Sequence, residues 1–101
     1  MKDYASMSNF EINKEVSMAL LDKSANPSAR YVAIGDYCSN PADAWTIIAE
    51  NKITVHAPMR YDELQEWLAF DVHDSDTDFK DVNPLRAAMI VFLMMKENEN
   101  D

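Results

Sequence analysis

Nine consecutive apolar residues, 87–95, constrain this 101-residue chain more than any other feature. A helix that spans a membrane needs about 20 apolar residues, so this run is too short to cross one. It lies between Arg86 and Lys96, and its side chains make the predicted helix apolar on almost every side. The rest of the chain must therefore cover this helix, which we expect to be the central or interfacial one. Its predicted seam consists of Leu85, Ala88, Met89, Phe92 and Leu93.

Cap signals predict where the helices begin. Asn40–Pro41 and Asn83–Pro84 each combine a capping asparagine with a proline at the first helical position, where no amide is needed. Ser8 and Glu11 have the spacing of a capping box, and apolar residues at helical spacing follow them. We therefore predict helices over about residues 9–22, from residue 41 to a left-handed cap at Asn51, and from residue 84 to about residue 97.

Two strands are predicted between the second and third helices. Residues 53–57 and 66–72 both alternate in the manner of strands. Residues 60–65 suit either a helical turn or a strand, and residues 30–37 suit a short strand or an extended loop. The order of elements predicts an α+β fold, a small two-layer sandwich in which about three helices pack on a short antiparallel sheet, as a single domain over residues 1–101.

The acid excess concentrates in one part of the chain. Eighteen acids and nine Lys or Arg residues give a net charge of −9. Residues 60–82 hold eight acids against two bases, a net charge of −6, and the tip at residues 96–101 adds −2. We expect residues 71–82 to form an acidic loop. Since phosphate contacts need clustered Lys and Arg, direct binding to nucleic acid is not expected.

No motif indicates a catalytic, metal or cofactor site, and we expect none of the three. Gly35, the one glycine, cannot build a phosphate-binding loop, and a single cysteine excludes internal disulfides and multi-cysteine zinc sites. Cys38 near a helix start could be a nucleophile, but a buried structural cysteine is the favoured interpretation. The alternate carboxylates of residues 74–78 begin like a calcium loop that lacks its glycine and its final glutamate. His56 and His73 have no fixed metal-ligand spacing.

Aromatic residues and methionines are divided between core and surface. We expect Trp45 and Met89 in the core, whereas Met94 and Met95 suit either the core or a protein-binding surface. The predicted interaction surface combines apolar residues with the acidic segment. Its members are Asp62, Glu63, Glu66, Asp71, Asp74, Asp76, Asp78, Asp81, Trp67, Met94 and Met95.

Three blocks carry a resemblance to a known family. They read YCSNPADAWTIIAEN (37–51), NPLRAAMIVFL (83–93) and FEINK (10–14). These blocks resemble the NinX-like family, small proteins of lambdoid phages and enterobacterial prophages, and the likeness is weakest over residues 59–82. A more distant similarity, to a phage domain described as an alpha-beta-alpha sandwich, agrees with the predicted fold. The resemblance implies an accessory phage protein and offers no catalytic residues; Arg86 is expected to pair with an acid of the acidic loop.

Three functional hypotheses are open. The first is a non-enzymatic phage accessory protein of the host cytoplasm, whose acidic segment orients a basic host or phage protein. The second is a DNA mimic whose carboxylates imitate a row of phosphates. The third is a small-ligand binder with a pocket at a dimer interface near Trp67 and Met94. Residues 1–10 are polar, so neither a secretory signal nor a membrane partner is expected, and exposed sheet edges leave a homodimer open.

Overall fold

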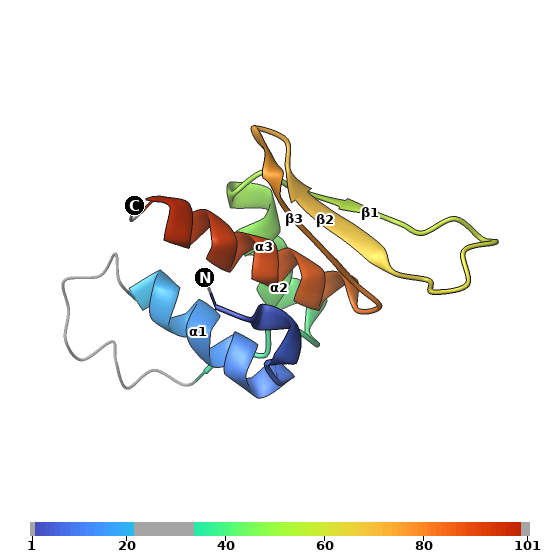
Figure 1. Ribbon diagram of the computed structural model, residues 1–101. Coiled ribbons are helices and arrows are strands. Elements are labelled where there is room, and N and C mark those ends of the chain that lie inside the picture. The colour runs from blue at the N-terminus through green and yellow to red at the C-terminus, as the bar shows by residue number, and fades with distance from the viewer. Residues whose placement is uncertain (1, 22–33, 100–101) are drawn as a thin grey trace.

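Helices and strands are segregated along the chain, which the computed structural model describes over residues 2–21 and 34–99. In these residues a short 3-10 helix, η1, precedes three α-helices and a three-stranded antiparallel sheet (Figure 1). This is the small α+β fold that the sequence predicts. The elements are η1 (Tyr4–Ser6), α1 (Asn9–Leu21), α2 (Pro41–Glu50), β1 (Ile53–His56), β2 (Trp67–Asp71), β3 (Asp74–Asp81) and α3 (Pro84–Glu99).

Helix α3 is the centre of the fold. It lies between the sheet on one side and α1 on the other, and α2 also packs against it (Figure 1). Every residue from Arg86 to Leu93 is buried, so the helix is covered by other parts of the protein on all sides over about two turns. The central helix predicted from the apolar run is therefore confirmed, since a helix can be apolar on all sides only when several neighbours cover it.

The two faces of the sheet have different surroundings. The strand order is β1-β2-β3, and the register places Val55 opposite Ala69 and Ala69 opposite Phe79. Directly opposed side chains share a face, and Ala69 is fully buried, so this row faces α3. The helices lie on that side of the sheet (Figure 1). The other face, which we call the open face, carries the rows Thr54–Phe70–Asp78 and His56–Leu68–Lys80.

The predicted helix caps are present. Asn40 Oδ1 accepts a hydrogen bond from the amide two residues later at 3.0 Å, and Asn83 Oδ1 accepts the equivalent bond at 2.9 Å. Ser8 and Glu11 form the capping box, in which each side chain accepts the other residue's amide, at 3.1 and 3.2 Å. These side chains satisfy amides that the first turn of a helix leaves without partners.

Part of the predicted acidic loop is a strand. Residues 74–81, inside the predicted loop 71–82, form β3. Its acids alternate with Thr77, which is buried, and Phe79, which packs against the core. This two-residue period directs charge to the open face and packing side chains to α3, as a half-buried strand requires.

Two predictions for α2 and its end are wrong. Trp45 was expected in the core but is 65% exposed. The inward stripe of α2 consists of Ala44, Ile47 and Ile48. Asn51 was expected in the left-handed region but has a φ of −97°, and its side chain donates to a carbonyl of the last turn. Lys52 makes the left-handed turn instead, with a φ of 57°.

For two further segments the sequence allowed two structures, and the predicted end of the first helix also differs from the described one. Residues 60–65 belong to the connection between β1 and β2 and are neither helix nor strand. Residues 30–33 of the predicted strand or extended loop, and residue 22 at the predicted end of the first helix, lie outside the described residues. Residues 34–37 form no strand.

Candidate interaction surface

The structure separates the eight acids that were predicted to share one surface. Two acids of β3, Asp76 and Asp78, are exposed to solvent. Three acids lie in the connection between β1 and β2, namely Asp62, Glu63 and Glu66. The last three, Asp71, Asp74 and Asp81, accept hydrogen bonds at the ends of the β2–β3 hairpin.

Asp81 faces inward and pairs with Arg86, as expected for an acid of this segment. The Arg86 Nε and Asp81 Oδ2 atoms lie 3.1 Å apart, and the arginine side chain is 10% exposed. The remaining guanidinium nitrogens donate to Asn9 Oδ1 at 2.9 Å, to the Tyr4 carbonyl at 3.1 Å and to the Met7 carbonyl. Arg86 thus joins α3 to β3, to α1 and to the N-terminal segment, and Asp81 serves the fold rather than a binding surface.

The hairpin turn between β2 and β3 uses its carboxylates as internal acceptors. Asp74 accepts the Thr77 hydroxyl at 2.7 Å and the Asp76 amide at 3.1 Å, and these two bonds hold the pKa of Asp74 below its usual value. Asn98 at the end of α3 donates to Thr77 Oγ1 at 3.2 Å. In the part of the chain that the structure describes, no three His, Cys, Asp or Glu side chains gather where they could hold a metal ion.

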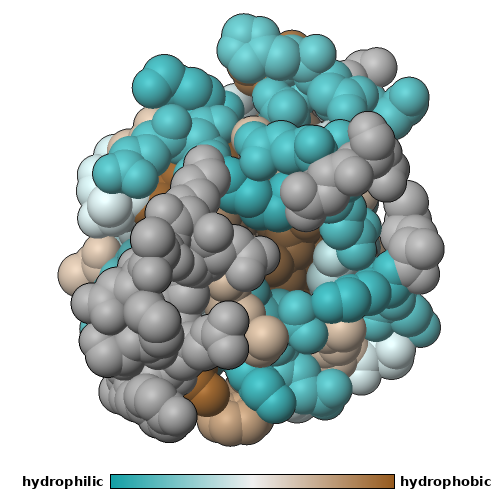
Figure 2. Space-filling view, turned by 90° about the vertical axis from the view of Figure 1, so that its left-hand side faces the viewer, coloured by the Kyte–Doolittle hydropathy of each residue, from teal (hydrophilic) through white to brown (hydrophobic). Residues whose placement is uncertain are grey.

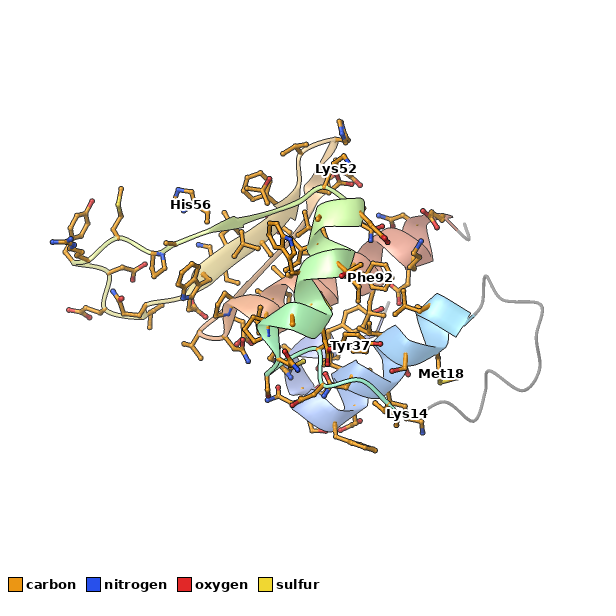
Figure 3. The ribbon with its side chains drawn as sticks, turned by 180° about the vertical axis from the view of Figure 1, so that it is seen from behind. Lys14, Met18, Tyr37, Lys52, His56 and Phe92 are labelled. Atoms are coloured by element: carbon orange, nitrogen blue, oxygen red, sulfur yellow. The ribbon has the colours of Figure 1, made fainter. Side chains whose placement is uncertain are left out.

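The open face combines apolar and charged side chains. Leu68 and Phe70 are half-buried there. Phe70 lies directly opposite Asp78, and Leu68 lies between His56 and Lys80. Figure 3 shows His56 on the side of the sheet away from the helices. The face therefore has an apolar centre bordered by ionisable groups.

The connection between β1 and β2, residues 57–66, is an unexpected feature that we call the arm. Its ten residues exceed the two to five of most hairpin loops. It projects beyond the sheet and away from the helices (Figure 1). Met59, Tyr61 and Leu64 on the arm are 57%, 84% and 69% exposed. Sequence reasoning placed the acids of the arm on the predicted interaction surface but missed these apolar side chains, although three large apolar residues in a segment without a clear strand pattern were their signal.

Hydrogen bonds within the arm define its shape. The Asp62 amide donates to the Met59 carbonyl at 3.0 Å, and the Leu64 amide donates to Asp62 Oδ1 at 3.0 Å. The side-chain amide of Gln65 donates to the Met59 carbonyl at 2.9 Å and also to the Asp62 carbonyl. Gln65 itself has a φ of 50°, which turns the chain back toward β2. The arm is therefore folded on itself while its apolar side chains face outward.

Trp67 and Met94, near which a pocket at a dimer interface was predicted, lie at opposite ends of the sheet within one chain. Trp67 is opposite Asp81, close to the start of α3. Met94 lies one turn before Asn98, which contacts the hairpin turn at the other end of β3. Met94 and Met95 are half-buried against the core, which favours the packing interpretation for both. Figure 2 shows the face at this end of α3, where an apolar patch lies between hydrophilic residues.

Cys38 is buried, as the favoured interpretation predicts. Its amide donates to Asn13 Oδ1 at 3.0 Å, and its carbonyl accepts from Asn83 Nδ2 at 2.7 Å. Burial raises the pKa of the thiol to about 11, so the thiolate is a negligible fraction at neutral pH. The surroundings of Cys38 link α1 to the start of α3, which is a structural role.

A comparison with known families identifies the chain. The sequence matches the family described as Bacteriophage P22, NinX over residues 3–96, which includes the arm, the hairpin and most of α3. The chain belongs to this NinX family. Membership makes it a phage accessory protein and confirms the resemblance carried by the three sequence blocks. No curated protein and no solved structure matches it. None of the helices in the described residues is long and apolar enough to cross a membrane.

Proposed function

We propose that this NinX-family protein is a non-enzymatic interaction module of the host cytoplasm that binds a basic host or phage protein. The observation that carries the proposal is the open face, where half-buried Phe70 lies opposite exposed Asp78 and half-buried Leu68 lies between His56 and Lys80. An apolar centre with a charged rim is the usual anatomy of a protein-binding surface. The net charge of −9 would steer a basic partner toward the protein and raise the rate of encounter.

The positions of Cys38 and of the two histidines support a role without catalysis. Cys38 is buried and protonated at neutral pH, whereas a catalytic cysteine is an exposed thiolate beside a base. His56 ends β1 next to the arm, and His73 lies in the hairpin turn at the other end of the sheet. The two histidines therefore cannot orient each other or share a substrate.

The two alternative functions have less support. A DNA mimic needs a long, regular row of exposed carboxylates, but Asp81 is paired with Arg86 and Asp74 bonds to Thr77. Only two acids remain on the exposed side of β3. A ligand pocket at a dimer interface near Trp67 and Met94 would have to bring Trp67 of one copy close to Met94 of the other, since the two residues lie at opposite ends of the sheet within one chain.

The test is capture of partners from phage-infected cells on the immobilised full chain, followed by measurement of affinity for the purified partner. We expect binding to weaken as salt rises from about 0.1 M to about 0.5 M, because salt screens attraction between exposed charges. Asp76→Asn and Asp78→Asn should each weaken binding about two- to fivefold. The control is Glu50→Gln, which removes an exposed acid of α2. An affinity that changes neither with salt nor in the two β3 variants would contradict the proposal.

A further inference from the structure

The arm presents apolar side chains that the fold does not use. Three of its ten residues, Met59, Tyr61 and Leu64, are large apolar residues with more than half of their surface exposed. A long connection that carries such residues outside the core of a rigid scaffold is a common location for binding. Large exposed apolar patches on monomers are likewise often functional, whereas single exposed residues are not.

From this arrangement we infer that the arm is an anchor that inserts Tyr61 and Leu64 into an apolar pocket of a partner protein with a basic rim. The inference deepens the proposed function and rests on it, since it names the contact that holds the basic partner. The open face would then orient the partner, while the arm contributes most of the affinity. Tyrosine is enriched among the few residues that dominate binding energy at interfaces.

The charge of the arm favours a basic rim. Asp62 and Glu63 are exposed beside the apolar side chains, and half-buried Glu66 ends the arm, against a single base, Arg60. The Asp62 Oδ1 atom already accepts the Leu64 amide, but the carboxylate keeps its negative charge. Lys or Arg side chains around the pocket would complement these acids, whereas an acidic rim would be repelled.

The same observations disfavour a second copy of this chain as the occupant. Each copy carries a net charge of −9, so two acidic arms would repel each other. The arm exposes three large apolar side chains, whereas each partner contributes about 20–30 residues to a stable interface of standard size. A shallow contact between two arms would not hold a dimer, whereas insertion into a pocket also buries the sides of the arm.

The internal hydrogen bonds of the arm suit it for insertion. Gln65 and the Asp62 carboxylate tie the turn together, at 2.9 and 3.0 Å from their partners. A segment that holds its bound shape before it meets a partner loses less conformational entropy on binding. Met59 provides the carbonyl that two of these bonds share, so its backbone is fixed while its side chain stays exposed.

The test uses site-specific photo-crosslinking in phage-infected cells, with the full chain in each case. Photoreactive benzoylphenylalanine replaces Tyr61 in one variant and Trp45 in another. Trp45 is the matched control because it is an aromatic residue, 65% exposed, on α2. We expect position 61 to form a covalent adduct and position 45 to form none. The crosslinked peptide of the partner should lie among apolar residues with Lys or Arg close by.

A binding measurement with the purified partner completes the test. Tyr61→Ala should weaken affinity about 30-fold, as for an interface anchor, and Trp45→Ala should leave it within about twofold of wild type. Circular dichroism of both variants verifies that they fold. A crosslink from position 61 to another copy of the chain, a crosslinked site without basic residues, or an unchanged affinity of Tyr61→Ala would overturn the inference alone. If the wild-type chain binds no protein, the proposed function and this inference both fail.

Discussion

Replacement of Arg86 by methionine tests the central claim about how the layers are joined. Methionine preserves the apolar stem of the side chain and removes the guanidinium, which bonds to Asp81, to Asn9 and to carbonyls of the N-terminal segment. Removal of one partner from a buried ion pair costs about 3–5 kcal/mol of unfolding free energy. We expect about 3 kcal/mol, because Asp81 keeps its bond with the Asn83 amide at 2.8 Å.

The assay is urea unfolding of the Arg86→Met variant, with the melting temperature as a second measure. A loss of about 3 kcal/mol is large beside the about 5–15 kcal/mol that stabilises a typical domain, and it should lower Tm by at least about 12 °C. The control is Lys2→Met, which removes the exposed pair between Lys2 and Glu15 (2.9 Å) and should cost less than about 1 kcal/mol. Hydrogen exchange should accelerate at residues 4–8 in Arg86→Met only. Equal losses of stability in the two variants would refute the reasoning.

Three further predictions concern single side chains. Tyr4→Phe removes the 2.6 Å bond to Glu97 and should cost about 1 kcal/mol of unfolding free energy. Because burial raises the pKa of Tyr4, the stability of the wild-type protein should fall above about pH 10. Urea unfolding across this pH range should show a smaller fall in the variant, which has no hydroxyl to ionise. Burial also raises the pKa of Cys38 to about 11, so its contribution to stability is complete below about pH 9 and is lost toward pH 11; a thiol reagent should label it only as the protein unfolds. Trp45→Ser should change the free energy of unfolding by less than about 0.5 kcal/mol, whereas Phe92→Ala should cost about 3–5 kcal/mol, both by urea unfolding.

Local signals predicted those parts of the fold that depend on neighbours in sequence. A cap needs only one side chain and the next few amides, so Asn40 and Asn83 could be recognised from their Asn-Pro pairs. The apolar run of α3 likewise implies burial whatever surrounds it. β3 was harder, because its alternating acids suggested a solvated loop, and its strand pairing depends on β2 and on the packing of Thr77 and Phe79 against distant elements.

The candidate surface was less predictable because it depends on strand register and packing. Composition alone cannot show that Asp81 turns inward to Arg86 while Asp78 faces outward, since the difference arises from where each lies in the hairpin. The exposure of Trp45 follows from which side of α2 meets α3. The arm was missed for a related reason: apolar residues such as Tyr61 suggested a helical turn until the ends of β1 and β2 were known.

The central position of α3 determines when the protein can fold during its synthesis. α3 is the last of the described elements to leave the ribosome, yet the sheet, α1 and α2 all pack on it. Arg86 lies 82 residues after Tyr4, whose carbonyl it binds. At a synthesis rate of roughly 5–20 residues per second, Arg86 is made at least about four seconds after Tyr4. Until α3 emerges, α1 lacks the helix that it packs against, and α2 has only its contacts with β1. The nascent chain therefore acquires its layers in one late step rather than helix by helix.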